Sequence, residues 1–435
     1  MELKKYKLGE ILDVTRGASL SGEFYATEGE YIRLTCGNFD YQNNCFKENK
    51  SKDNLYYTGD FRSEFLMEKG DIITPLTEQA IGLLGSTAII PENGKYIQSQ
   101  DVAKIICKED LLDKDFAFYL ISSTLVKQQL SATAQQTKIR HTSPDKIKDC
   151  TAWIPELAEQ KRISKLLRSL DCKIGLNRAI NQNLEAMAKQ LYDYWFVQFD
   201  FPNEEGKPYK SSGEVMVYNE RLGREIPQGW STMPISGILD KYPTTKRYET
   251  KEYLSCGKYP IIDQGDSYIA GFTNEIDHLL TRHPAVLFGD HSTKVKFLDF
   301  DFARGADGTQ ILYSSNKAVS QYYLYLAVSA LQIPNPGYSR HFKYLKELPI
   351  IIPGLKIANK FKNIVKPLFE EWTKNIFCNI ELTKQRNELL PLLMNGQVSV
   401  NSDLSVCINL FIRTTTRICS YPNDLFWSYL CIVFL

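Results

Sequence analysis

Residues 156–196 read ELAEQKRISKLLRSLDCKIGLNRAINQNLEAMAKQLYDYWF. Apolar and amide side chains recur along this segment at alternating intervals of four and three residues. This interval is the heptad spacing of a helix that keeps one narrow stripe against a partner helix. The ten stripe positions are Ile163, Leu167, Leu170, Ile174, Asn177, Asn181, Leu184, Ala188, Leu191 and Trp195. The spacing predicts a single helix over 156–196, about 60 Å long at about 1.5 Å per residue.

The same pattern returns 198 residues further along the chain, with Ile163 matched by Phe361. The first helix follows Trp153-Ile154-Pro155, and its counterpart follows Ile351-Ile352-Pro353. Seven stripe pairs are apolar in both copies: Ile163/Phe361, Leu167/Val365, Leu170/Leu368, Ile174/Trp372, Leu184/Leu382, Leu191/Leu389 and Trp195/Leu393. The pairs Asn177/Asn375 and Asn181/Asn379 are asparagine in both copies, and Ala188/Arg386 alone differs in kind. This self-similarity predicts an internal duplication, and Pro367 should break or kink the second helix near its start.

The matched stripes favour pairing of the two helices with each other. A buried amide weakens such a seam but fixes its register, because it needs another amide as its partner. We therefore assign Asn177, Asn181, Asn375 and Asn379 as register residues of an antiparallel coiled coil with a pseudo-two-fold axis. The alternative is two unrelated amphipathic helices, each packed only on its own domain.

The remaining sequence has the pattern of an α/β fold of mixed α+β type. Short apolar runs such as 71–74, 102–106 and 285–288 alternate with Gly, Asn and Asp, which predicts strands. Apolar spacing predicts helices over 114–130 and 320–331. We expect two globular domains separated by the pair of long antiparallel helices. The predicted segments are a first domain at 1–154, a helical segment at 155–201, a connector at 202–215, a second domain at 216–353, a second helical segment at 354–400 and an atypical hydrophobic tail at 401–435.

The bulk composition limits the class of protein. The chain has 435 residues and a net charge of +1, so any nucleic-acid surface must be a local concentration of Lys and Arg. Its ten cysteines include no C-x-x-C pair and no cysteine–histidine cluster at metal-ligand spacing. This predicts reduced thiols in the cytoplasm and no metal site. No signal peptide is recognised and no run of 18 uncharged apolar residues occurs, so we expect no membrane span.

Each predicted domain ends in a polar, basic loop, and the Arg-His dipeptide of the first loop recurs in the second. Arginine and lysine bind phosphates and guanine, whereas glutamine and asparagine favour adenine. The predicted DNA contacts are Lys138, Arg140, His141, Lys146 and Lys148 in the first domain, and Tyr338, Arg340, His341 and Lys343 in the second. Weaker candidates in the second domain are Lys246, Arg247, Lys294, Lys296 and Arg304. A solvated surface loop is the alternative for any single basic cluster.

No catalytic residues are predicted. The sequence lacks a G-x-x-x-x-G-K-[ST] phosphate loop and a G-x-S-x-G nucleophile elbow, and its five histidines form no evident triad. Asn335-Pro336-Gly337-Tyr338 is similar to the Asn-Pro-Pro-Tyr motif of amino-methyltransferases, but glycine replaces the second proline and no glycine-rich cofactor loop follows an early strand. We interpret this segment as a turn in the second basic loop.

Several motifs together resemble the specificity subunit of type I restriction-modification enzymes. Ile154-Pro155-x-Leu157-x-Glu159-Gln160-x-x-Ile163 is similar to the start of that family's first conserved helix, and Leu191-Tyr192-x-x-Trp195-Phe196 is similar to its end. Gly223-Arg224-x-Ile226-Pro227-x-Gly229-Trp230 resembles the signature that opens a target-recognition domain. The resemblance covers residues 1 to about 400 of the chain. The second copy departs from it, with Ala358-Asn359 in place of Glu159-Gln160.

The resemblance implies a non-catalytic, sequence-specific DNA-binding subunit. Each target-recognition domain would read one half of a bipartite site in double-stranded DNA, and the helices would set the spacing. The implied partners are two methylation subunits and the restriction subunits that translocate and cleave DNA. These partners would bind S-adenosylmethionine, ATP and Mg, and this chain would bind no cofactor. The alternatives are a self-contained adenine-N6 DNA methyltransferase or nuclease and a purely structural coiled-coil adaptor.

The sequence changes character after residue 400. Residues 401–435 are hydrophobic, hold three of the ten cysteines and continue no heptad. We interpret them as the product of a frameshift or recombination junction, with a genuine extra hydrophobic element as the alternative. Truncation at Asn401 should leave assembly and DNA specificity intact.

Overall fold

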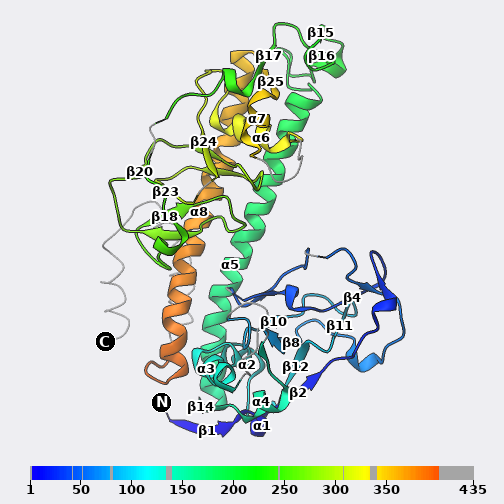
Figure 1. The fold of residues 1–435 in the computed structure, drawn as a ribbon, viewed down its shortest axis with the longest axis vertical. Helices are drawn as coiled ribbons and strands as arrows, with labels where there is room; N and C mark the ends of the chain where they lie inside the picture. Colours follow the sequence, from blue (N-terminus) through cyan, green and yellow to red (C-terminus); the bar gives the residue numbers. More distant parts are fainter. Residues whose placement is uncertain are drawn as a thin grey trace. The chain divides into compact units, whose positions relative to one another are not determined.

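The computed structural model describes residues 2–41, 43–50, 52–78, 82–133, 140–242, 245–306, 308–333 and 340–400. The chain divides into two compact units, which Figure 1 colours along the sequence. The first unit combines Met1–Gly175 with Cys378–Leu435, and the second is Leu176–Phe377. Each unit therefore contains one globular domain and a part of both long helices. The predicted tail at 401–435 lies outside the described residues.

Two long helices carry the predicted heptad stripe. Helix α5 spans Leu157–Tyr192 and continues into one π-helical turn at Asp193–Val197, and α8 spans Leu355–Met394. All ten stripe positions of α5 are buried or half-buried, which confirms the predicted helix and its apolar face. The predicted break at Pro367 is wrong, because α8 runs through it. The proline is exposed, whereas Val365 and Phe369, two residues before and after it, are buried in the hydrophobic cluster, so packing holds the helix on both sides of the position that lacks an N–H.

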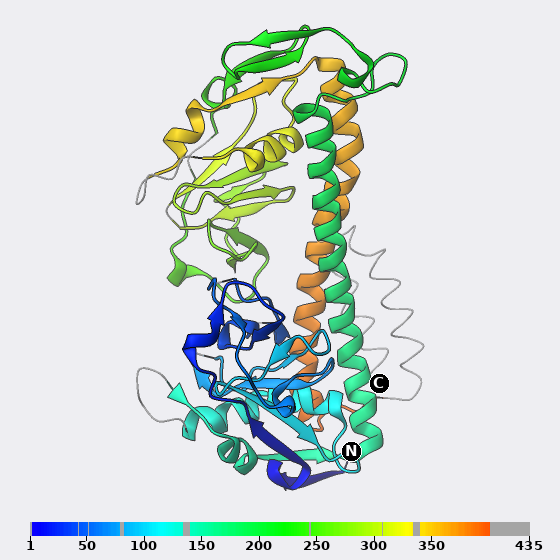
Figure 2. The ribbon, with the colours of Figure 1, turned by 90° about the vertical axis from the view of Figure 1, so that its right-hand side faces the viewer.

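The two helices run antiparallel within each unit, as both views show (Figure 1 and Figure 2). Residue numbers rise along one helix and fall along the other: Asp171 meets Arg386 and Ile174 meets Asn379 in the first unit, and Asn181 meets Asn375 and Trp195 meets Phe361 in the second. This confirms the predicted antiparallel pair. It excludes the alternative in which each helix packs only on its own domain.

Amide side chains bridge this seam. The four predicted register residues are buried or half-buried: Asn177, Asn181, Asn375 and Asn379. Asn375 Nδ2 donates to Asn181 Oδ1 at 3.0 Å, and Asn181 Nδ2 donates to the Trp372 carbonyl at 3.0 Å. Asn379 Nδ2 donates to the carbonyl of Ile174 at 3.3 Å. These bonds tie the amides to particular turns of the opposite helix.

The first globular domain contains two four-stranded sheets covered by short helices. Its strands are β1 (Leu3–Lys7), β2 (Leu12–Arg16), β3 (Tyr25–Ala26), β4 (Tyr31–Arg33), β5 (Phe39–Asp40), β6 (Cys45–Phe46), β7 (Tyr56–Tyr57), β8 (Ile72–Pro75), β9 (Thr77–Glu78), β10 (Ala88–Ile89), β11 (Tyr96–Ile97), β12 (Val102–Cys107), β13 (Arg140–His141) and β14 (Thr151–Pro155). Its helices are α1 (Leu8–Ile11), α2 (Lys114–Ile121), α3 (Thr124–Thr133) and α4 (Pro144–Asp149). The sheet orders are β10-β8-β12-β2 and β11-β4-β7-β3.

The prediction of one helix over 114–130 is wrong, because this segment forms the two helices α2 and α3. The Ser122 hydroxyl bonds back to the carbonyls of the preceding turn, and Ser123 Oγ accepts from the Val126 N–H at 3.4 Å. Serine side chains compete in this way with helix continuation, and they cap a new helix.

The second globular domain also combines two larger sheets with short helices, but one of these sheets has three strands and the other has four. Its strands are β15 (Met216–Asn219), β16 (Arg224–Pro227), β17 (Ser231–Pro234), β18 (Tyr259–Ile262), β19 (Gly271–Thr273), β20 (Leu279–Leu280), β21 (Ala285–Gly289), β22 (Val295–Leu298), β23 (Phe302–Arg304), β24 (Thr309–Leu312) and β25 (Pro349–Ile352). Its helices are α6 (Gln321–Ala330) and α7 (Phe342–Glu347), and α6 confirms the helix predicted over 320–331. The sheet orders are β22-β21-β24 and β19-β18-β23-β20.

Matching hydrogen bonds show that the two domains are copies. Strand β1 pairs antiparallel with β14, and β17 pairs antiparallel with β25. At the end of the first ribbon the Leu8 N–H donates to the Cys150 carbonyl at 2.8 Å, and at the second the Ile235 N–H donates to the Leu348 carbonyl at 3.0 Å. Cys150 and Leu348 differ by the same 198 residues as the helical stripes. The predicted internal duplication is confirmed.

An aromatic cluster anchors the end of α5 in the second domain. Phe196, from the π-helical turn, packs edge-on against Phe361 and Tyr323 at 4.8 and 4.7 Å between ring centroids. Phe201 stacks on Trp230 at 4.8 Å. The Gly-Trp motif therefore serves packing, since its indole holds the chain that leaves the helix.

Candidate nucleic-acid interface

In the first unit, the basic loop returns to the domain through β13, which pairs antiparallel with β9. This register sets Arg140 opposite Glu78 and His141 opposite Thr77. Arg140 Nη1 lies 3.6 Å from a carboxylate oxygen of Glu78, whose side chain is buried. Thr77 Oγ1 lies 3.4 Å from His141 Nδ1 and donates to Asp101 at 3.2 Å. The Arg-His dipeptide is thereby fixed just beyond the end of β8.

The second Arg-His dipeptide is fixed at an equivalent place. The His341 N–H donates to the carbonyl of Asp290 at 2.8 Å, and the Phe342 N–H donates to the Asp290 carboxylate at 2.8 Å. Asp290 directly follows β21, the central strand of its sheet. Both Arg-His dipeptides are therefore attached near the end of an inner strand, so the repeated dipeptide has a shared structural place.

Three predicted DNA contacts are buried side chains: Lys296, Arg304 and His341, which are 7%, 2% and 3% exposed. Lys296 Nζ donates to the carbonyls of Asp263 at 2.7 Å and Ser267 at 2.6 Å. The Arg304 guanidinium donates to the hydroxyl of Thr309 at 3.0 Å and also to its carbonyl. The side chains of these three residues point into the domain and not to solvent, so the predicted direct contact with DNA lacks an accessible side chain in this structure. They brace the loops from inside instead.

Acidic partners face other candidate lysines. Lys148 lies 3.1 Å from Asp145 and 3.7 Å from Asp13, Lys246 lies 3.1 Å from Glu252 and 3.2 Å from Glu275, and Lys294 pairs with Asp266. Hydrogen bonds to these carboxylates raise the pKa of Lys148 and of Lys246, so both remain charged at neutral pH. Solvent screens exposed pairs of this kind, so they contribute little to stability and a phosphate can displace the carboxylate at small cost.

The remaining candidates are open to solvent to different degrees. His141, Arg247, Arg340 and Lys343 are exposed, and Lys146 is half-buried. Lys343 Nζ lies 4.6 Å from the ring centroid of Tyr344, which orients the ammonium without neutralising it. Lys138 and Tyr338 lie outside the described residues, as does the whole Asn335-Pro336-Gly337-Tyr338 motif.

Polar residues beyond the predicted set also meet in the second unit. Gln264 Oε1 accepts from the His291 N–H at 3.0 Å. Gly308 has a φ of +85°, and a Cβ at this position would lie 2.4 Å from Gln264 Nε2. Gln264 and His291 carry no motif of their own. The glycines beside them are the signal in the sequence, because they mark loops whose backbones must approach closely.

The described part of the chain has neither a metal-ligand cluster nor a membrane-spanning helix. It holds no group of three or more His, Cys, Asp or Glu side chains arranged for a metal ion. No helix within it is long and apolar enough to cross a bilayer.

The duplicated fold and its paired basic loops agree with the sequence comparisons. Residues 1–186 and 227–387 match the profile of the type I restriction modification DNA specificity domain. The match covers most of the chain and both of its copies. The protein belongs to this family of DNA specificity proteins.

Individual specificity subunits are similar to this chain in sequence or in fold. It is 25% identical to the type I restriction enzyme MjaIX specificity subunit of Methanocaldococcus jannaschii over 328 residues, which cover 69% of this chain and 73% of that subunit. It is 26% identical to the HindI specificity subunit of Haemophilus influenzae, with 91% and 99% of the two chains covered. The crystal structure of the M. genitalium S subunit has the same fold, at a TM-score of 0.57 and 17% identity, with 91% and 96% covered.

Proposed function

We propose that this chain is the specificity subunit of a type I restriction-modification complex. Each globular domain reads one half of a bipartite site in double-stranded DNA, and the paired helices fix the distance between the halves. The observation that carries the proposal is the duplicated domain, in a family defined by DNA specificity, with an Arg-His dipeptide attached near an inner strand in each copy.

The reading surface, in this proposal, consists of solvent-accessible basic and histidine side chains on internally braced segments. His141 and Lys146 contact DNA from the first domain, and Arg247, Arg340 and Lys343 from the second. Arginine and lysine supply phosphate contacts and guanine contacts, which position the domain and discriminate bases respectively. The buried Lys296, Arg304 and His341 act indirectly, because they hold the loops in a shape that limits the entropy lost on binding.

Catalysis, in this proposal, is carried by other subunits. Two methylation subunits dock on the paired helices and supply S-adenosylmethionine and the methylation of adenine. Restriction subunits supply the ATP- and Mg-dependent translocation and cleavage. The complex works in the cytoplasm, where the cysteines remain thiols. A self-contained methyltransferase or nuclease is not favoured, because the family match spans both copies and describes DNA specificity.

Genome-wide mapping of methylated adenine tests the proposal. The chain is coexpressed with its methylation subunit in a host without adenine methylation, and the modified positions are read by long-read sequencing. We expect one bipartite motif with a gap of constant length, because two readers on a stiff spacer sample one separation. A strain that carries the methylation subunit alone is the control. A continuous motif, or the same motif in the control, would contradict the proposal.

A further inference from the structure

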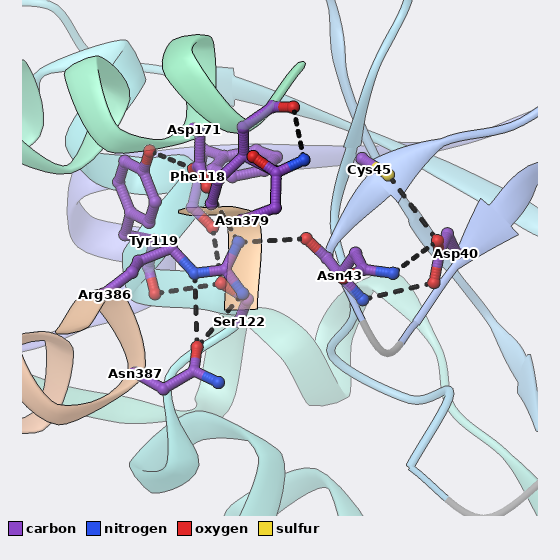
Figure 3. A network of polar contacts seen from close by, with 11 residues as sticks. Asp40, Asn43, Cys45, Phe118, Tyr119, Ser122, Asp171, Asn379, Arg386 and Asn387 are labelled. Carbon is purple, nitrogen blue, oxygen red and sulfur yellow. Dashed lines mark hydrogen bonds and ion pairs between the residues drawn. The ribbon is translucent and has the colours of Figure 1, made fainter. Parts of the chain in front are cut away.

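One position breaks the match between the two helical stripes, and it holds a buried ion pair. In the first unit, Asp171 on α5 pairs with Arg386 on α8 at 2.7 Å (Figure 3), with side chains 22% and 8% exposed. Tyr119, from α2, donates to the second carboxylate oxygen of Asp171 at 2.5 Å. The guanidinium also donates to Asn387 Oδ1 at 3.0 Å and to the Asn43 carbonyl at 3.4 Å. The pair is therefore held from both sides.

The equivalent pair in the second unit is apolar. A shift of 198 residues takes Asp171 to Phe369 and takes Arg386 back to Ala188. Phe369 and Ala188 are 4% and 1% exposed and belong to one hydrophobic cluster. Tyr325, on α6, lies beside Phe369 at 5.6 Å between ring centroids, as Tyr119 on α2 lies beside the carboxylate. The same place in the seam is thus filled by a charged pair in one unit and by a large and a small apolar residue in the other.

The rest of the stripe does not distinguish one helix from the other. Its matched positions are apolar with apolar or asparagine with asparagine, so α5 helices from two chains could pair in the same register, and so could two α8 helices. In an α5–α5 pair, each Asp171 would face Ala188 of the other chain. In an α8–α8 pair, each Arg386 would face Phe369. Both arrangements bury charges without their partners, which is strongly destabilising.

We propose that the Asp171–Arg386 pair, held by Tyr119, selects α8 as the partner of α5 and excludes pairing between like helices of two copies of this chain. The ion pair then acts as a specificity device, since a nearly symmetric apolar seam would otherwise invite self-association and helix exchange. This role is separate from DNA reading, because it governs how the chain folds on itself.

Two full-length variants with different affinity tags test this inference. R386A leaves the carboxylate on α5 without its cation, and D171F leaves the guanidinium on α8 without its anion. When the two variants are coexpressed, α5 of R386A can pair with α8 of D171F, which restores the ion pair between chains. The reciprocal seam then carries a phenylalanine and an alanine, as the second unit already does. The readout is native mass spectrometry of the coexpressed protein purified through each tag in turn, so that homodimers are retained, without DNA or partner subunits.

We expect a 1:1 dimer that exceeds either variant's homodimer by about tenfold, because only the mixed dimer satisfies both seams. Each variant alone should have a lowered melting temperature or aggregate. D171F/R386A in a single chain should regain its melting temperature but form dimers, because its apolar pair no longer excludes pairing between like helices. K366E, which alters an exposed pair with Glu370 on α8, should behave as the unmodified chain. The inference fails if coexpression yields no excess of mixed dimer, or if the double variant remains a monomer. A loss of DNA binding would not affect these readouts.

Discussion

The position of Lys296 on β22 determines whether its side chain binds inside the domain or reaches a ligand in solvent. Its ammonium lies inside the second unit, bound to two loop carbonyls, and Asp263 Oδ1 is 3.9 Å away. Burial lowers the pKa of this lysine to about 8, and the charge of Asp263 opposes that shift. The residue therefore stabilises its loops through hydrogen bonds while retaining a desolvation cost at neutral pH.

That cost predicts an unusual pH dependence of stability. The folded pKa of Lys296 lies below its unfolded value of 10.5, so the unfolded state binds the proton more tightly. Below about pH 8 the charged Lys296 lowers the free energy of unfolding by its full desolvation cost. As the pH rises toward the unfolded pKa, the free energy of unfolding increases by up to about 3 kcal/mol. We expect the stability of the unmodified chain, relative to K296M, to rise between pH 7.5 and 9.5 in denaturant titrations. K251M, at an exposed lysine, is the control, and parallel pH profiles for the unmodified chain and K296M would contradict the assignment.

Arg340 and Lys343 are exposed basic side chains, so we expect them to make a measurable electrostatic contribution to DNA binding. If each contacts a phosphate, R340A/K343A should weaken binding by the assembled methylation complex and reduce the slope of log Kd against log salt by about two. Fluorescence anisotropy on a target duplex at several salt concentrations measures both quantities. K207A, at an exposed connector lysine, should leave the slope unchanged. An unchanged slope in the double variant would remove this loop from the DNA surface.

Residue types alone predicted only part of this surface. The Arg-His repeat was visible because both copies keep the dipeptide, and each copy lies over an inner strand. The burial of Arg304 and Lys296 was not visible, because the inward face of a short strand depends on register and neighbouring loops. Glu78, the last residue of β9, and Asp290, which follows β21, hold the two Arg-His dipeptides, and neither belongs to a motif.

At the scale of elements, the long helices were the most predictable feature. Ten positions at heptad spacing predicted which face of α5 is buried, and the same spacing in the second copy supported the prediction independently. The continuity of α8 through Pro367 and the division between α2 and α3 were not predictable. Both depend on tertiary packing and on local serine hydrogen bonds, which outweigh the apolar period.

The buried amides of Asn181 and Asn375 should lower the stability of the α5–α8 seam while they specify its register. N375L should lower the melting temperature, because it removes the Nδ2 group that donates to the side-chain oxygen Oδ1 of Asn181. The unpaired buried oxygen costs about 1–3 kcal/mol. N181L/N375L should recover or exceed the original value, since both polar groups are then absent from the seam. Scanning calorimetry of the four proteins in the cycle gives the coupling. N183L, on the exposed side of α5, serves as the matched control, and additive effects in the cycle would refute direct pairing.

At the scale of the whole molecule, the proposed spacing role predicts a change of target. Insertion of one heptad after Gly175 and another after Phe377 keeps both stripes in phase and lengthens the pair by about 10 Å. At about 3.4 Å per base pair, the gap in the methylated motif should grow by about three positions while both half-sites stay the same. Methylome mapping measures the gap. A four-residue insertion, which shifts the stripe out of phase, should destabilise the pair, and an unchanged gap after the heptad insertions would rule out the spacing role.

Each domain begins and ends on one antiparallel ribbon, β1 with β14 in the first copy and β17 with β25 in the second. The last strand of each ribbon leads into a long helix, and its hydrogen-bonded neighbour is the strand from which the rest of that domain follows. Genetic exchange of everything between such neighbours would replace a whole domain in one step and leave the scaffold sequence intact. This closure gives a lineage a simple route to new DNA targets, because half of the recognised site can change by recombination while the other half is inherited unaltered.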